Sequence, residues 1–169
     1  MSTLIPVSSL EFRENVKIRF SNILDGLDNY LNFEIKSSSL DNGENKMIDF
    51  ISEVFELNDC EAYVDLYFNN LDEEAKDNLL SLCCADDKEI ITKQMKLNHD
   101  EPYYKVTDKS LIPFLARLNT REVFFVTFYF TKKPLTVWGN YNMTFPCFTE
   151  NKEDLEFYKK IAKHYSLAY

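Results

Sequence analysis

Residues 121–148 read REVFFVTFYFTKKPLTVWGNYNMTFPCF, and this stretch decides the fold. Its first half, residues 123–130, is apolar except for one threonine and rich in β-branched and aromatic side chains, which is typical of a strand buried on both faces. Residues 131–134 interrupt the run with two lysines and a proline, as a short hairpin connection does. Residues 135–145 then alternate between apolar and polar side chains, which predicts a second strand with one buried face. We therefore expect an antiparallel hairpin here, ended by Pro146.

Apolar side chains spaced three and four residues apart predict helices in most of the remaining chain. The first helix begins at Ser8 or Ser9, because Ser8 and Glu11 have the spacing of a capping box, and its apolar stripe continues to Leu31. The later helices are expected at residues 46–57, 60–68, 71–85, 107–118 and 151–165. Short strands are expected at residues 33–35 and, from a weak alternation, at residues 89–97.

This order of elements predicts the α+β class. A helix-rich N-terminal half is expected to pack on a small, mostly antiparallel sheet from the C-terminal half, closed by a C-terminal helix. At 169 residues and 45% hydrophobic content, the chain is expected to be a single globular domain spanning residues 1–169. Only three glycines and five prolines argue against a many-turned β-sandwich or barrel.

The composition also predicts a compartment. No window approaches 18 apolar residues and the N-terminus lacks the pattern of a signal peptide, so we expect a soluble, cytoplasmic protein without membrane contact. The four cysteines include no Cys-x-x-Cys pair, and a chain of this length does not need cross-links for stability. A reducing environment without a disulfide framework is therefore expected.

Motifs for catalysis, cofactors and metals are missing from the sequence. His99, followed by Asp100 and Glu101, is the nearest approach to a catalytic base with an orienting acid, but adjacent turn residues point apart, so a solvated histidine is the simpler interpretation. Cys83 and Cys84 are adjacent on a helical pattern, so both thiols cannot easily face one ion, and no second ligand pair completes a tetrahedral site. We therefore expect no enzyme activity, no cofactor and no metal.

The charge is concentrated in the middle of the chain. Residues 51–100 hold 13 acids and 4 bases, a net charge of −9 that equals the net charge of the whole chain. This acidity disfavours direct nucleic-acid binding, which needs clustered Lys and Arg, and favours a basic protein partner. The alternative is a solvated acidic face without a partner.

Partner-binding residues are predicted along this acidic stretch, with one tryptophan as an aromatic anchor, because Trp and Tyr are enriched where interfaces bind most strongly. The predicted residues are Glu53, Glu56, Asp59, Glu61, Asp65, Asp72, Glu73, Asp77 and Trp138. Trp138, Tyr103, Tyr104 and Tyr141 offer aromatic surface, for which packing on a sheet face is the alternative role.

A small, acidic, motif-free α+β chain rich in Asn, Lys, Phe and Tyr resembles the bacterial immunity proteins that accompany polymorphic or contact-dependent growth-inhibition toxins. The resemblance lies in this overall profile and assigns no individual residue. It implies a one-to-one inhibitor that occludes the active site of a cytosol-acting basic toxin, often a nuclease. Two alternatives stay open: a phage- or host-encoded inhibitor or adaptor of another protein, and an enzyme with a carboxylate site. The enzyme would need a deep pocket with two or more acids of raised pKa. The oligomeric state stays unknown.

Overall fold

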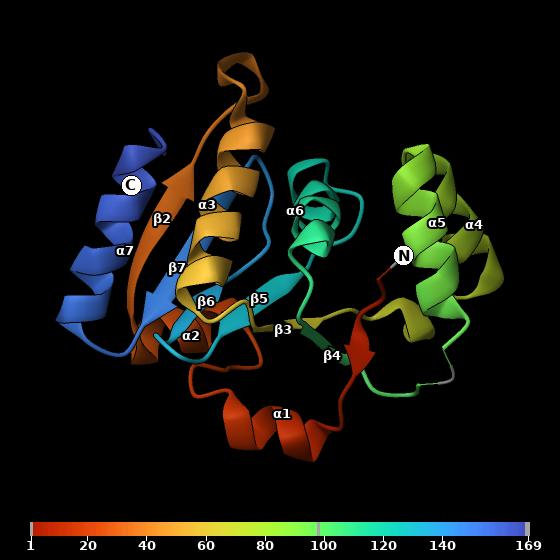
Figure 1. Cartoon of the computed structure of the whole chain (residues 1–169), viewed down its shortest axis with the longest axis horizontal. Helices are drawn as coiled ribbons and strands as arrows, with labels where there is room; N and C mark the ends of the chain where they lie inside the picture. Colours follow the sequence, from red (N-terminus) through yellow and green to blue (C-terminus); the bar gives the residue numbers. More distant parts are fainter. Residues whose placement is uncertain (1, 98, 168–169) are drawn as a thin grey trace.

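A computed structural model of the chain describes residues 2–97 and 99–167, and Figure 1 shows the arrangement of its elements. The strands are β1 (Ile5–Pro6), β2 (Leu31–Lys36), β3 (Ala62–Asp65), β4 (Tyr103–Val106), β5 (Thr127–Phe130), β6 (Leu135–Val137) and β7 (Thr144–Thr149). The α-helices are α1 (Ser9–Asn15), α2 (Ile23–Asn29), α3 (Gly43–Leu57), α4 (Glu73–Leu82), α5 (Ala85–Met95), α6 (Ile112–Thr120) and α7 (Lys152–His164). Short 3₁₀ turns cover Ser39–Asp41, Phe68–Asn70 and Lys109–Leu111.

The strands form one antiparallel sheet with the order β1-β4-β3-β5-β6-β7-β2. The predicted α+β class and the closing C-terminal helix are confirmed. Three of the strands, β1 to β3, come from the N-terminal half, so the sheet is wider than the one expected from the C-terminal half alone. The hairpin β5–β6 lies near its middle, with Phe128 paired to Val137.

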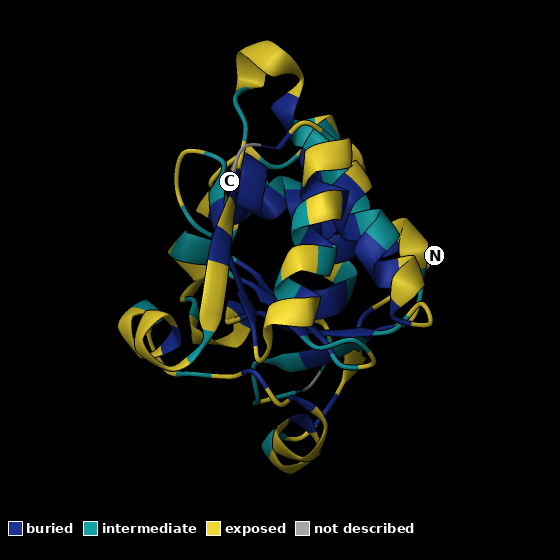
Figure 2. Cartoon of the chain, turned by 90° about the vertical axis from the view of Figure 1, so that its left-hand side faces the viewer, coloured by how far each residue is buried: buried dark blue, intermediate teal, exposed yellow. Residues whose placement is uncertain are grey.

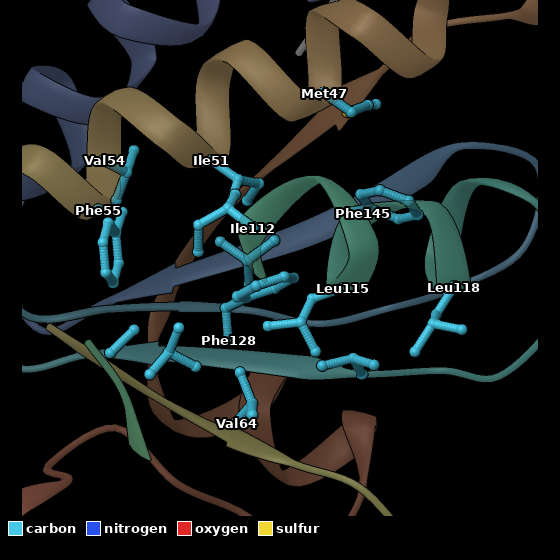
Figure 3. Close-up of a cluster of buried hydrophobic side chains, with 14 of the residues drawn as sticks. Met47, Ile51, Val54, Phe55, Val64, Ile112, Leu115, Leu118, Phe128 and Phe145 are labelled. Atoms are coloured by element: carbon cyan, nitrogen blue, oxygen red, sulfur yellow. The ribbon is translucent and has the colours of Figure 1, made fainter. Parts of the chain in front are cut away.

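Helices α3, α6 and α7 cover one face of the sheet, and their apolar side chains pack against it. Figure 3 shows Val64 and Phe128 of the sheet beneath Ile51 and Phe55 of α3 and Leu115 of α6. The side chains of this cluster are almost completely shielded from solvent. The inward positions predicted on α3 and α6 are confirmed, apart from Ile48 of α3, which is half-buried. This layer is the main hydrophobic core, because it holds the larger of the two clusters of buried apolar residues.

The opposite face of the sheet is covered by α1, the segment of residues 16–22 and α2. Alternate strand residues point to this side, and Tyr63 and Tyr129 form a second, smaller cluster with Phe12 of α1. The hydroxyl of Thr136 donates a hydrogen bond of 2.6 Å to the carbonyl oxygen of Ile18, which ties the connecting segment to the sheet. The central strands β3, β5 and β6 are buried along their whole length. The edge strand β2 and helix α1, which lies at the bottom of Figure 2, are largely exposed.

The prediction of one long helix from Ser8 to Leu31 is wrong. Ser8 does cap α1, since its side chain accepts a hydrogen bond from the Glu11 N–H, as the capping box predicts. Helix α1 nevertheless ends at Asn15, because Val16 is extended and buried against the sheet. Asn22 then caps a separate helix. The apolar stripe therefore covers the sheet through a bent segment rather than through one straight helix.

The predicted helix at residues 60–68 is a strand. Asp59 and Cys60 have left-handed φ angles of 61° and 55°, so the chain turns sharply after α3. Residues 62–65 then pair with β4 on one side and β5 on the other, and all four are buried. Pairing with two neighbouring strands therefore determines the conformation of this segment, although its apolar residues have helical spacing.

Two further boundaries differ from the predictions at residues 71–97. The helix expected at residues 71–85 is divided at Cys83, which is extended, and the strand expected at residues 89–97 belongs to helix α5. Asp87 explains the second difference, because it lies in the first turn of α5 and accepts two hydrogen bonds from Arg117, of 2.8 and 2.5 Å. This ion pair holds α5 against α6, so a helix is stabilised where the alternation was weak.

The predicted hairpin is confirmed only in its centre. Residues 123–126 precede β5, and the second strand ends at Val137 instead of continuing to residue 145. Asn142 and Met143 have left-handed φ angles of 58° and 47°, and the chain there reverses into β7. Pro146 lies inside β7 rather than ending the hairpin.

Candidate functional site

A cleft of about 800 Å³ opens on the face of the sheet that α1 and the segment after it flank. Its lining comes from Phe12, Arg13, Arg19, Phe20, Ser21, Asp65, Tyr67, Tyr103, Phe125, Thr127, Tyr129, Trp138, Gly139, Asn140 and Tyr141. Eight of these side chains are aromatic. The volume lies within the range of protein sites that bind small molecules, about 300–1,000 Å³.

Neighbouring strands bring the floor of the cleft together. Asp65, the last residue of β3, pairs with Tyr103 of β4 on one side and with Thr127 of β5 on the other. Paired residues of an antiparallel sheet point to the same face, so these three side chains form one row. Tyr67 lies two residues after Asp65 and lines the same cleft. The sheet register, rather than any local motif, therefore creates the floor.

Two stacked aromatic pairs form the walls. Phe12 lies parallel to Tyr103, with 3.9 Å between the ring centroids and 10° between the planes. Phe20 stacks on Trp138, with a centroid distance of 5.2 Å and an angle of 21°. Stacked pairs of this kind contribute about 0.5–1.5 kcal/mol beyond the area that they bury. The walls are thus formed by rings that support one another without a ligand.

A glycine and an asparagine position the far wall. Asn119 at the end of α6 clamps Val126, accepting from its N–H at 2.8 Å and donating to its carbonyl oxygen at 2.9 Å. A Cβ atom on Gly139 would collide with the Asn119 side chain and with the Val126 carbonyl. Only glycine permits this close approach, which fixes the strand ends from which Phe125 and Trp138 project.

Asp65 is the one carboxylate among the lining residues. It is 8% exposed, and its Oδ1 accepts a hydrogen bond from the Thr127 N–H at 2.8 Å. Its Oδ2 accepts from the Tyr129 hydroxyl at 3.0 Å. Burial raises the pKa of Asp65 to about 6, and these hydrogen bonds offset the effect only in part. At neutral pH the floor of the cleft is therefore negatively charged, and it loses this charge in mild acid.

Three tyrosines surround this carboxylate. Burial and then the charge of Asp65 raise the pKa of Tyr67 to about 12, and the same two causes, in the same order, raise the pKa values of Tyr103 and Tyr129. All three phenols therefore stay protonated at neutral pH. They offer hydroxyl groups and ring faces, rather than charge, to anything that enters the cleft.

Two exposed arginines, Arg13 of α1 and Arg19 of the following segment, line the mouth of the cleft. The guanidinium of Arg19 donates a hydrogen bond to the Val16 carbonyl oxygen. Neither arginine forms an ion pair with Asp65 or with any other carboxylate among the described residues. The cleft therefore combines a positive mouth with a negative floor in a chain of strongly acidic composition.

The structure brings only two of the predicted partner-binding residues together in this cleft, Asp65 and Trp138. The others lie elsewhere, at the end of α3, at the start of β3 and along α4, and Figure 1 shows α3 and α4 on opposite sides of α6.

Asp59 and Asp77 are exposed, while Glu53 accepts a hydrogen bond from Tyr165 and Asp72 caps α4. Glu56, Glu61 and Glu73 form ion pairs of 2.5, 2.8 and 2.7 Å with Lys109, Lys105 and Lys76. Their role in binding a partner stays a prediction.

The histidine and cysteine side chains converge on no shared site within residues 2–97 and 99–167. Nε2 of His99 lies 3.3 Å from the Tyr103 carbonyl oxygen, whereas Glu101 accepts hydrogen bonds from Ser9. The cysteines form no disulfide; Cys60 and Cys84 are exposed, whereas Cys147 is buried. No group of three or more His, Cys, Asp or Glu side chains that could hold a metal ion occurs in these residues.

Sequence reasoning missed the arginines and several of the aromatic residues of the cleft, namely Arg13, Arg19, Phe20, Tyr67 and Tyr129. One signal for the floor was available. Tyr63, Asp65 and Tyr67 alternate with apolar residues, which marks one polar face of a strand.

Comparison with protein-family models, with curated proteins and with solved structures found no match. Among the described residues, no helix is both long enough and apolar enough to cross a membrane.

Proposed function

We propose that this protein is a non-catalytic cytoplasmic inhibitor that neutralises a basic, cytosol-acting toxin, with a nuclease as the expected activity. The observation that carries the proposal is the lining of the cleft, which holds one tryptophan, four tyrosines and two arginines. These three residue types dominate the binding energy of protein interfaces. The resemblance of the sequence to bacterial immunity proteins points to the same class.

The distribution of charge supports a basic partner. Asp59 and Asp77 are exposed and form no ion pair among the described residues, and the side chain of Glu73 is 88% exposed. Exposed charges of one sign raise the rate at which an oppositely charged protein arrives, while a few buried anchors determine how long it stays. The acids of α3 and α4 would steer the partner, and the aromatic cleft would hold it.

The experiment is capture of the partner by the tagged protein from the organism that encodes it, at low and at high salt. A dominant basic protein is expected at low salt and in a smaller amount at high salt, because salt screens exposed charges. The purified partner must then lose its activity when an equal amount of this protein is added. Absence of a partner at both salt concentrations, or a partner whose activity is unchanged, would contradict the proposal.

A matched pair of charge reversals tests the steering role. Asp77→Lys alters a predicted partner-binding residue on α4, whereas Glu150→Lys makes the same charge change at an exposed residue between β7 and α7. The Asp77 variant is expected to associate with the partner several-fold more slowly than the Glu150 variant. Equal rates would show that net charge alone, and not a local surface, attracts the partner.

An enzyme is the second candidate, because a buried carboxylate with a raised pKa inside a cleft is typical of catalytic acids and bases. Asp65 has this property, but the lining holds no second carboxylate to share acid–base work with it. Turnover of a small-molecule substrate that is lost in Asp65→Asn would favour this candidate over the inhibitor.

A further inference from the structure

Asp65 is a buried carboxylate, 8% exposed, that forms no ion pair among the described residues. Burying a negative charge without a positive partner is costly, so a cation that reached Asp65 would gain a strong interaction. Thr127 and Tyr129 each donate a hydrogen bond to one of the two carboxylate oxygens, and the Thr127 hydroxyl and the Asp65 N–H add weaker interactions. A carboxylate oxygen accepts more than one hydrogen bond, so an N–H donor that enters the cleft can still interact with Asp65.

The walls above Asp65 suit a flat cation. The stacked pairs Phe12–Tyr103 and Phe20–Trp138 both contribute to the lining, and aromatic faces attract positive charge through their quadrupoles. A guanidinium is planar, stacks on aromatic rings and donates two parallel hydrogen bonds to a carboxylate. Neither stacked pair has a cation over its rings among the described residues. Both preferences of a guanidinium are therefore met in one place.

We propose that the cleft receives an arginine side chain of the basic partner, with its guanidinium on Asp65 and its stem between the aromatic walls. This inference rests on the proposed function, since a basic toxin supplies the arginine. It names the cleft as the anchor of the complex and Asp65 as the residue that recognises the partner's charge.

The charged and titratable groups that face Asp65 are Arg13 and Arg19 at the mouth and Tyr67, Tyr103 and Tyr129 beside it. The tyrosines are neutral at neutral pH, so they do not oppose a cation. The arginines are exposed and therefore screened by water, whereas the interaction with Asp65 takes place in a buried, low-dielectric environment. The competing ligand is an anion held by the two arginines, and its binding would respond to pH in the opposite way.

The pH dependence separates these two ligands. Since the pKa of Asp65 is about 6, the carboxylate is charged above that pH and neutral below it. A guanidinium needs the charged form, so its affinity should be constant above about pH 7 and fall as the pH drops through 6. An anion would instead bind more tightly as Asp65 becomes neutral.

Trp138 allows a direct measurement, because it is the single tryptophan of the chain and lies in the cleft. The probe is N-acetyl-arginine methylamide, and the control is the citrulline analogue, which has nearly the same shape without the charge. At pH 7.5 we expect a saturable change in Trp138 fluorescence with the arginine probe and none with citrulline. The affinity for the arginine probe should fall at pH 5.

Asp65→Asn is the decisive variant, because asparagine has nearly the same shape and can still accept from the Thr127 N–H. It should remain folded by circular dichroism and bind the arginine probe at least about tenfold more weakly. No saturable change in the wild type, an equal response to citrulline, unchanged affinity in the variant, or tighter binding at low pH would each overturn the inference.

Partner capture distinguishes this inference from the proposed function. If Asp65→Asn retains the inhibited partner as well as the wild type does, the arginine anchor is wrong and the proposed function stands. If neither protein captures a partner, the proposed function fails, while the fluorescence titration still decides what the cleft binds.

Discussion

Phe128 and Tyr129 are neighbours in β5, and they belong to opposite faces of the sheet. Phe128 lies beneath α3 and α6 in a layer of apolar side chains, as Figure 3 shows. Tyr129 points to the cleft, where its hydroxyl donates to a buried carboxylate. The same strand thus supplies a packed core on one side and a polar floor on the other.

This difference shows where stability and binding lie in the molecule. The face beneath α3 and α6 buries apolar side chains, such as Phe128, that contribute through packing. The cleft face retains the buried charge of Asp65 and leaves Tyr141 59% exposed, and neither feature improves packing. Features that lower or do not improve stability are typical of functional sites. We therefore expect substitutions on the two faces to have different consequences.

The largest effect is expected for Phe128→Ala. Phe128 is 1% exposed, and removing its ring should lower the free energy of unfolding by about 3–5 kcal/mol, because a cavity is left in a packed core. Urea unfolding measures this loss. The matched control is Phe125→Ala on the cleft side, where the ring is only half-buried and the loss should be clearly smaller. Equal losses would contradict the division between the two faces.

Asp65→Asn should have the opposite effect and raise the free energy of unfolding, by a smaller amount than Phe128→Ala lowers it. Because the folded-state pKa is raised from 3.8 to about 6, the contribution of Asp65 to stability is present below pH 4 and lost as the pH rises through 6. The variant removes this loss and should be about 3 kcal/mol more stable than the wild type at pH 7.5, because each unit of pKa shift corresponds to about 1.4 kcal/mol. Unfolding curves between pH 4 and pH 8 test it.

The difference between Asp65→Asn and the wild type should shrink toward pH 4. A companion variant, Tyr129→Phe, removes one hydrogen bond to the carboxylate and should raise the pKa of Asp65 further. If Asp65→Asn were less stable than the wild type at pH 7.5, the carboxylate would be part of the stabilising core rather than of a binding site.

The smallest effect on stability is expected for Tyr141→Ala. This side chain is 59% exposed, and its one ring contact within residues 2–97 and 99–167 is with Phe125, at a centroid distance of 4.7 Å. The free energy of unfolding should change by less than about 0.5 kcal/mol, while retention of the captured partner should fall. A large loss of stability would mean that the cleft wall is structural, and unchanged retention would place the interface elsewhere.

The sequence predicted those elements whose signals were local. The cap at Ser8 and the inward positions of α6 were read correctly, because a capping residue and a helical face depend on residues three or four apart. The strand β3 was read as a helix, because its two neighbours in the sheet, β4 and β5, are remote in the sequence. Pairing decided its conformation, and pairing leaves little trace in a single segment.

The cleft could be predicted only in part for the same reason. Asp65 and Trp138 were identified separately, one for its charge and the other for its ring, but their common location depends on the sheet register and on the clamp between Asn119 and Val126. No sequence pattern around Arg19 predicts that it lines the cleft, because its position at the mouth depends on the extended segment after α1.

The order of the strands also has a consequence for the rate of folding. Strands β5, β6 and β7 follow one another and can pair early as a local meander. In contrast, β1 pairs with β4 through residues 5 and 105, and β2 pairs with β7 through residues 31 and 149. Both edge strands must therefore close very long loops before they form a hydrogen bond with the sheet. Chains with such distant pairings fold slowly. We therefore expect the meander to be protected from hydrogen exchange well before either edge strand during refolding.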